Sequence, residues 1–404
     1  MKIRRLIAVI LAVIMSLGCF GAAVTAAEGN MDKTLKFGDD GKFTVLHVTD
    51  IQDVYPMISV AKKFLSDTID KVKPDLVVLG GDNIAGNCIH TSGTVERAIN
   101  EYMSIFEAKG VWVAMVFGNH DDENKCSTKY TQLEIYQKYD CFVGCAGYTE
   151  EDHVGNYNLP VLSSDGKRTA FNFWLIDSGT YNGENDLDGY ACVTKTQIEW
   201  YKQQSKALAD ANGGVPVPSI AFQHIIVPEI FDALKAVDKD TEGAKEKTFA
   251  GTGETKYFVL PEGAEGELNE TPCPPDYSNG QFDAMKENGD VLAMVFGHDH
   301  TNTFNVEHEG VRLINTAGLS FNVTSYNGGN MGMRSFVIDE NNPEDFETEV
   351  IDYFDIYSED DRLMSSGFEM CNHNNNYFVR FYWFLVHYTE KFKSSIVRIF
   401  TGGC

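Results

Sequence analysis

The most constraining feature of the chain is an alternation of three apolar, strand-like segments with two helical ones near its start. The strand-like segments are β-branched or fully apolar, as expected of strands that are buried on both faces. The intervening segments place apolar side chains at helical spacing. The pattern predicts a buried, largely parallel sheet covered by helices. The strand-like segments span residues 43–48, 76–79 and 111–117, and the helical segments span 57–72 and 95–108.

Shorter apolar runs predict further strands in the second half of the chain. Residues 229–290 differ from them, because they are rich in Gly, Pro and acidic side chains and show no sustained period. We expect this span to be a long surface excursion near the site, and we expect residues 124–165 to be irregular as well. The further strands are predicted at residues 170–176, 219–223, 291–296, 311–315 and 334–338.

Side chains that commonly bind metals follow five of the predicted strands, at the point where each strand ends. Because ligands bind beyond the carboxyl ends of strands in an open α/β sheet, we expect these side chains to converge on one site. Imidazole and carboxylate groups together suit Fe, Zn or Mn, and a pair of such cations can clamp an in-line displacement at phosphorus. The strand ends carry Asp50-Ile51-Gln52, Gly81-Asp82-Asn83, Gly118-Asn119-His120-Asp121, His224 and Gly297-His298-Asp299-His300.

In this order the motifs resemble the signature of the calcineurin-like metallophosphoesterase superfamily, which is Asp-x-His, Gly-Asp, Gly-Asn-His-Asp/Glu, His and Gly-His-x-His. The resemblance covers about residues 42–340 and is nearest to the branch around the purple acid phosphatases. It implies an α/β fold, a two-sheet, four-layer α/β sandwich. It also implies two divalent or trivalent metal ions (Fe, Mn or Zn) and hydrolysis of small-molecule phosphate mono- or diesters by a metal-bound hydroxide.

The resemblance also implies a role for each matching residue. His120 would protonate or stabilise the leaving oxygen, with Asp121 as an orienting partner. The metal ligands would be Asp50 and His300 at the first ion, Asp82 as the bridge between both ions, and Asn119, His224 and His298 at the second ion.

Gln52 departs from the family pattern, which usually has histidine at this position. A glutamine oxygen is a neutral and weaker ligand than imidazole, so the first metal site is either looser or does not include Gln52. The neighbouring Asp53 is a candidate to compensate. The tyrosine that colours the purple enzymes would fall at Ala85, so no purple colour is expected.

The first 27 residues have the pattern of a secretory signal peptide. A basic start is followed by an apolar run at residues 6–17 and by small residues that fit cleavage after Ala26 or Ala27. An uncleaved membrane anchor is the alternative. We therefore expect a secreted or cell-surface protein, in which the eight later cysteines form either disulfides or buried thiols.

The charge balance argues against a nucleic-acid partner. The chain has 59 acidic against 33 basic side chains, a net charge of −26, and such a surface repels phosphate polyanions. The span 377–400 is the exception, because it combines aromatic residues at helical spacing with a basic opposite face. This amphipathic helix either docks on the acidic body or lies in an anionic membrane interface.

The sequence thus predicts a signal peptide at residues 1–27, a catalytic domain at 36–350 and a C-terminal extension at 351–404 with the amphipathic helix. The predicted activity is that of an exported, metal-dependent phosphoric ester hydrolase. Two alternatives remain: a catalytically silent extracellular protein of the same fold that binds metal or ligand, and a protein whose function is membrane contact through residues 377–400.

Overall fold

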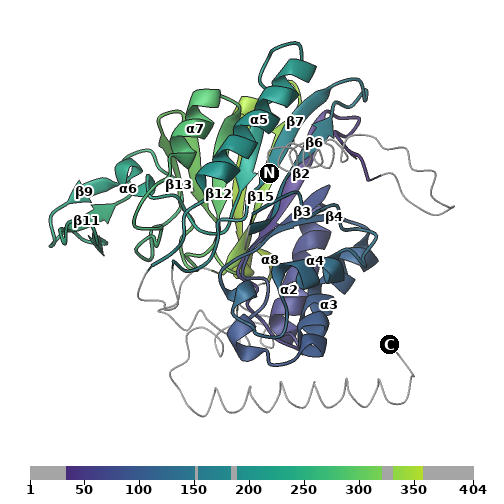
Figure 1. Cartoon of the computed structure of the whole chain (residues 1–404), viewed down its shortest axis with the longest axis horizontal. Coiled ribbons are helices and arrows are strands. Elements are labelled where there is room, and N and C mark those ends of the chain that lie inside the picture. Colours follow the sequence, from purple (N-terminus) through teal and green to yellow (C-terminus); the bar gives the residue numbers. More distant parts are fainter. Residues whose placement is uncertain (1–32, 151–152, 183–188, 321–330, 358–404) are drawn as a thin grey trace, which may run out of the picture.

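Two β-sheets pack face to face, with helices on both outer faces, in the computed structural model of the chain (Figure 1). The structure describes residues 33–150, 153–182, 189–320 and 331–357. This architecture confirms the predicted four-layer α/β sandwich. The predicted signal peptide and the predicted helix at 377–400 lie outside the described residues.

The first sheet has five strands in the order β16-β15-β2-β3-β4. Strands β2, β3 and β4 run parallel, as the apolar pattern predicted, and β15 pairs antiparallel with both β2 and β16. Helices from the same half of the chain cover its outer face. The bounds are β2 Lys42–Val48, α2 Ser59–Val72, β3 Leu76–Gly80, α3 Ser92–Lys109, β4 Trp112–Val116, α4 Lys129–Tyr136, β15 Gly332–Asp339, β16 Glu347–Asp352 and α8 Tyr353–Ile356.

The second sheet follows the order β1-β6-β7-β8-β12-β14-β13, and β5 pairs with β6. Its central strands β7, β8, β12 and β14 are parallel, and α5 and α7 pack on its outer face. The bounds are β1 Leu35–Lys36, β5 Tyr148–Glu150, β6 His153–Leu162, β7 Thr169–Leu175, α5 Lys195–Ala211, β8 Ser219–Phe222, α7 Gln281–Asn288, β12 Val291–Phe296, β13 Asn305–His308 and β14 Val311–Asn315.

Alternation along the strands divides the core into layers. In β2, the side chain of Val45 packs between the two sheets, whereas that of its neighbour Leu46 packs under the helices. Both faces of the strand are therefore buried, which explains why the sequence shows a continuous apolar run rather than an alternating one.

The ends of the helices follow from local chemistry. Helix α2 ends at Lys73, which has a left-handed φ of 53° and precedes Pro74. The side chain of Thr91 caps the first turn of α3, and Gly110 ends that helix in the left-handed region. These helix ends set the lengths of the connections that carry polar residues at the sheet edge.

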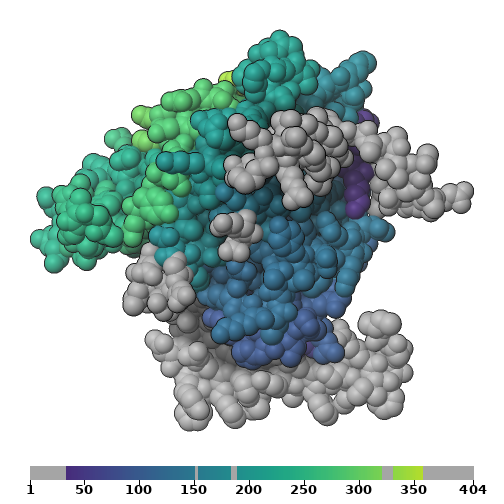
Figure 2. All heavy atoms as spheres, in the orientation of Figure 1, coloured from purple at the N-terminus to yellow at the C-terminus, as the bar shows by residue number. Residues whose placement is uncertain are grey.

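The prediction that residues 229–290 are irregular is wrong in part. This span contains a small sheet of order β10-β11-β9 that extends from the body as a separate lobe (Figures 1 and 2). The rings of Phe231, Phe249 and Phe258 pack together and form the core of the lobe. The sequence did not indicate this core, because polar residues separate the three phenylalanines. The bounds are α6 Ile230–Ala233, β9 Lys235–Val237, β10 Lys245–Thr248 and β11 Thr255–Val259.

Residues 124–165 are also more ordered than expected, since they contain α4, β5 and β6. Three short 3₁₀ turns complete the described chain, at Gly86–Cys88, His120–Asp122 and Pro343–Asp345. Among the described residues, no helix combines the length and the apolar character needed to cross a bilayer.

Candidate metal centre

The predicted site residues come together where the carboxyl ends of strands from both sheets meet. Asp50, Asp82 and Asn119 follow β2, β3 and β4 of the first sheet. His224 follows β8 of the second sheet, and both His298 and His300 follow β12. The sandwich thus brings six residues from across some 250 positions to one place. Four of them are buried, and His298 and His300 are partly exposed.

Five of these residues form two groups that share one carboxylate. Asp82, His224 and His298 make the first group, and Asp50, Asp82 and His300 make the second. Within each group the possible ligand atoms all lie within 4.8 Å of one another. Asp82 belongs to both groups, so the arrangement suits two cations bridged by its carboxylate.

The distances show how closely the imidazoles face the carboxylates. Nε2 of His224 lies 3.1 Å from Oδ2 of Asp82, and Nε2 of His300 lies 3.4 Å from Oδ1 of Asp50. Nδ1 of His224 donates to the carbonyl of Gly80 at 2.9 Å. This bond orients the ring so that Nε2 points at the carboxylates, as the outer nitrogen bond of a metal-binding histidine commonly does.

Buried oxygens without a partner complete the donor set. Oε1 of Gln52 and Oδ1 of Asn119 are buried and accept no hydrogen bond from the residues that the structure describes. An unpaired buried oxygen is costly unless an ion or water satisfies it. Together with the carboxylates and imidazoles these oxygens make a mixed N/O donor set, which fits transition-metal ions of the Fe, Mn or Zn kind.

The backbone is strained at this site. Six non-glycine residues of the described chain have a left-handed φ, and four of them are site residues: Asp50 at 51°, Gln52 at 37°, Asp82 at 49° and His298 at 69°. Such conformations cost of order 1–3 kcal/mol each and persist only where the surrounding structure imposes them. Here they turn the side chains at the strand ends toward the common centre.

Two motif glycines are required by close approach. A Cβ atom on Gly118 would collide with the backbone nitrogen and carboxylate of Asp82, and one on Gly297 would collide with Thr49 and Asp50. Gly118 therefore allows two loops of the first sheet to approach each other closely, and Gly297 allows a loop of the second sheet to approach a loop of the first.

Burial and charge pairing act in opposite directions on the pKa values of the centre. Burial works to raise the pKa of Asp82, but the neighbouring His224 holds it below its usual range. Burial likewise works to lower the pKa of His224, and the charges of Asp82 and Asp50 raise it to about 10. Burial lowers the pKa of His298 to about 3, so this ring is neutral and keeps a lone pair for a ligand bond.

His120 stands at the edge of this centre. Its backbone N–H donates to Oδ1 of Asp82 at 2.8 Å, and its Nε2 lies 3.9 Å from Oδ2 of the same carboxylate. The side chain is 27 % exposed, so a substrate can reach it. Burial alone would lower its pKa, but the hydrogen bond to Glu123 and the charge of Asp82 raise the pKa to about 9.

The prediction that Asp121 orients His120 is wrong. The carboxylate on His120 belongs to Glu123, whose Oε2 accepts from Nδ1 at 2.6 Å. Asp121 is buried and instead accepts from the backbone N–H groups of Gly118 at 2.8 Å and Ile84 at 3.1 Å. Asp121 therefore ties the loop after β3 to the loop after β4.

Gln52 lies inside the centre, where its Nε2 donates to Oδ2 of Asp82 at 3.0 Å. Asp53 does not replace the missing imidazole, because its carboxylate accepts from the backbone N–H groups of Val54 and Ile58. The centre thus has an amide where the family usually has an imidazole.

Sequence reasoning missed Glu123, Tyr181 and Tyr190. Tyr181 accepts a hydrogen bond from Asn119, and the ring of Tyr190 stands edge-on to that of His298 at 4.5 Å between centroids. Glu123 lies three residues after His120, directly after the 3₁₀ turn His120–Asp122, and this spacing was a usable signal. The tyrosines lie in the loop after β7, a strand whose end carries no histidine or metal-ligand motif in the sequence.

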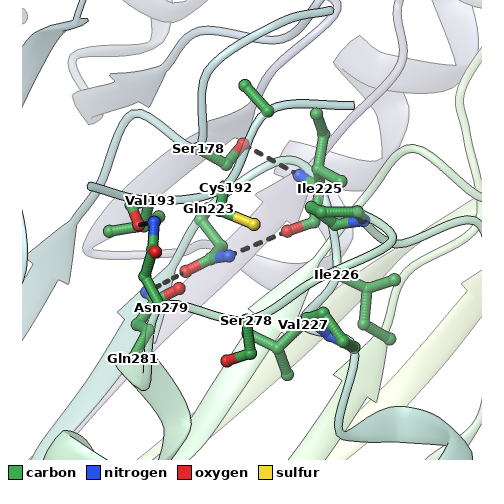
Figure 3. Close-up of a pocket in the computed structure, with 13 residues that line it drawn as sticks. Ser178, Cys192, Val193, Gln223, Ile225, Ile226, Val227, Ser278, Asn279 and Gln281 are labelled. Carbon is green, nitrogen blue, oxygen red and sulfur yellow. Dashed lines mark hydrogen bonds between the residues drawn. The ribbon is translucent and has the colours of Figure 1, made fainter. Parts of the chain in front are cut away.

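A small cavity lies among residues from the loops after β7 and β8 and from the start of α7 (Figure 3). Its volume of about 20 Å³ is enough for about one water, not for a substrate. Gln281 donates to Gln223, which in turn donates to the carbonyl of Ile225 at 2.8 Å. These bonds brace both sides of His224.

Comparison with known proteins identifies a family and several relatives. The family model described as calcineurin-like phosphoesterase matches residues 43–302. "Probable inactive purple acid phosphatase 14" of Arabidopsis thaliana is 28% identical over 353 residues, covering 79% of this chain and 80% of the relative. "Phosphatase DCR2" of Saccharomyces cerevisiae is 25% identical over 287 residues, covering 66% of this chain and 45% of the relative.

Among solved structures, a dimetal phosphatase from Danio rerio is similar, with a TM-score of 0.45 and 14% identity. The similarity covers 77% of this chain and 99% of that one.

Proposed function

From the premise that the chain belongs to the calcineurin-like phosphoesterase family, we propose that it is a phosphoester hydrolase that works with two metal ions. One observation carries the proposal: Asp82 is common to both groups of possible ligands. A shared carboxylate holds two cations close enough to act on one phosphoryl group.

The proposed ligands divide between the two metal ions. Asp50 and His300 would hold the first ion with Gln52 beside them, and the remaining ligands would hold the second. When bound, the cations supply positive charge for the phosphate oxygens and lower the pKa of a coordinated water. The second ion's ligands would be Asn119, His224 and His298, with Asp82 between the two ions.

His120 is the group that acts on the leaving oxygen in this proposal. Glu123 holds its Nδ1, so Nε2 is the nitrogen that faces the site and can carry the transferred proton. Because its pKa is raised, the imidazole keeps this proton at neutral pH. General acid help of this kind contributes about 10²–10⁴ in rate.

A catalytically silent protein of the same fold is the alternative. Relatives bear names that include the word inactive, and Gln52 weakens the first metal position. The complete set of other ligands and the partly exposed ring of His120 favour catalysis.

Metal content and a small ester panel test the proposal together. Purified full-length protein would be analysed for Fe, Mn and Zn and then assayed on a chromogenic phosphate monoester and a diester with added Mn²⁺ or Fe²⁺. We expect about two metal ions per chain and metal-dependent hydrolysis of at least one ester. Two bound ions without turnover of either ester would favour the silent alternative.

Export and the domain limits are part of the proposal. We propose cleavage after Ala26 or Ala27, a catalytic domain at 36–350 and an extension at 351–404 that includes the basic, aromatic segment 377–400. N-terminal sequencing of the protein released from expressing cells tests the first point. Pelleting of the full chain with anionic liposomes, against a chain ending at residue 370, tests membrane contact by the extension.

A further inference from the structure

A chain of hydrogen bonds links a predicted metal ligand to the predicted proton donor through a tyrosine. Nδ2 of Asn119 donates to Oη of Tyr181 at 2.9 Å, and that hydroxyl donates to Oε1 of Glu123 at 2.8 Å. The other oxygen of Glu123 accepts from Nδ1 of His120 at 2.6 Å. Asn119 and His120 are adjacent in the sequence, whereas Tyr181 comes from the loop after β7.

The direction of every bond in this chain follows from Glu123. A carboxylate only accepts, so His120 and Tyr181 must both donate to it. Since the single proton of the Tyr181 hydroxyl is committed to Glu123, its oxygen can only accept from Asn119. The amide nitrogen of Asn119 therefore faces the tyrosine, and the amide oxygen must face the opposite way.

The position of that oxygen agrees with this argument. Asn119 is 1% exposed, and its Oδ1 accepts no hydrogen bond from the described residues. A buried amide oxygen turned away from its only fixed partner, beside the carboxylate and imidazole ligands, is oriented to bind a cation. Rotation of the amide would place its NH₂ group there instead and abolish this interaction.

Several contacts fix the described residues on either side of Tyr181. Its ring stacks on that of Tyr190, with 5.6 Å between centroids, and the two residues form an isolated β-bridge. At the base of the loop, the carboxylate of Asp177 accepts from the buried ammonium of Lys129 at 2.8 Å and from the N–H of Gly179. The hydroxyl is thus presented by a fixed element rather than by a free side chain.

We propose that Tyr181 is a positioning residue that, with Glu123, sets Asn119 as an oxygen ligand and His120 as a proton donor for the same site. The inference rests on the proposed function and adds to it a coupling between metal binding and proton transfer. One hydroxyl serves both purposes, since it holds the amide of Asn119 at one end and the carboxylate that orients His120 at the other.

Tyr181→Phe tests this inference because it removes the hydroxyl and keeps the stacked ring. Metal-depleted full-length protein would be titrated with Mn²⁺ by calorimetry. At saturating Mn²⁺, kcat and KM would be measured on aryl phosphates whose leaving groups range from nitrophenol to phenol. Tyr257→Phe is the matched control, because Tyr257 donates to Glu246 at the same 2.8 Å in the exposed lobe of β10 and β11.

We expect Tyr181→Phe to weaken Mn²⁺ binding by about tenfold and to lower kcat by about tenfold for phenol, with a smaller loss for nitrophenol and KM little changed. Tyr257→Phe should match the wild type in both measurements. Unchanged Mn²⁺ affinity, or an equal loss of kcat across all leaving groups, would overturn the inference.

The two proposals fail in different ways. The Mn²⁺ titration does not need turnover, so a wild-type protein that binds Mn²⁺ but hydrolyses no ester refutes the proposed function alone. In that case the affinity of Tyr181→Phe still decides whether the tyrosine orients Asn119: weaker binding supports the orientation and equal binding overturns it.

Discussion

Nε2 of His224 lies 3.1 Å from Oδ2 of Asp82, and this contact joins the carboxyl ends of the two sheets at the candidate metal centre. The two side chains come from strands β8 and β3, which belong to different sheets. The centre is therefore a product of the face-to-face packing of the sandwich. The candidate metal centre therefore forms only when both sheets have folded and packed against each other.

Asp82→Asn should remove one or both metal ions from the protein. The substitution replaces a charged carboxylate common to both ligand groups with a neutral amide, which is a much weaker bridge. Elemental analysis of the purified variant measures the loss. Asp238→Asn, at an exposed position on the lobe, should keep the wild-type content, and equal metal content in the two variants would contradict the assigned bridge.

His120→Ala should keep both ions but lower kcat by about 10²–10⁴-fold on esters with poor leaving groups. The side chain contacts Glu123 and Asp82 from the edge of the centre, so its loss leaves the ligand groups in place. Metal analysis and steady-state kinetics on the same preparation give both quantities. Normal turnover by this variant would show that another group assists the leaving oxygen.

Gln52→His should tighten the first metal site, which includes Asp50 and His300. The Gln52 oxygen is buried and unpaired among the described residues, and an imidazole at this place is a stronger ligand for Zn²⁺ than an amide oxygen. Competition of metal-depleted protein with a coloured chelator measures the affinity. Gln137→His adds an imidazole at an exposed position and should change nothing; similar gains in both variants would point to unspecific binding.

Lys129→Met should lower the free energy of unfolding by about 3–5 kcal/mol, because it leaves the buried carboxylate of Asp177 without its cation. Lys129 is only 3% exposed. Urea denaturation monitored by tryptophan fluorescence measures the change. The exposed pair of Lys206 and Asp210 provides the comparison, and Lys206→Met should cost less than about 1 kcal/mol. Equal losses of unfolding free energy in the two variants would mean that the buried ion pair is no more important for stability than the exposed one.

His47 should make the protein less stable as the pH falls from 6.5 toward 3. Burial lowers its pKa in the folded state to about 3, while the unfolded chain takes up the proton near pH 6.5. The unfolded state therefore binds more protons in this window, and stability falls with falling pH. At pH 5 this term amounts to about 2 kcal/mol relative to pH 7.5.

Urea midpoints of the wild type and His47→Gln at pH 7.5 and pH 5 isolate the contribution of this histidine. The variant should lose less stability than the wild type on acidification. His90→Gln, at an exposed position, should follow the wild type. A variant whose stability falls with pH as steeply as that of the wild type would show that other groups carry the effect.

Several elements of the fold could be predicted because their signals are local. The continuous apolar runs of β2, β3 and β4 reflect burial on both faces, and Pro74 marks the end of α2. The small lobe at 230–259 could not be predicted, because its core consists of three phenylalanines spread among polar residues. A short stretch of sequence shows no helical or strand-like hydrophobic periodicity that would indicate such a cluster.

By itself the sequence determined the kinds of side chain at the strand ends and their order, because strands and the polar turns after them are encoded over a few neighbouring residues. Only the tertiary structure decided which end of the Asn119 amide faces the centre. That choice depends on Tyr181, a residue 62 positions from Asn119 that packing of the second sheet brings within 2.9 Å of it. The direction of the hydrogen bond between Asn119 and Tyr181 depends on this long-range contact, and no local pattern in the sequence predicts it.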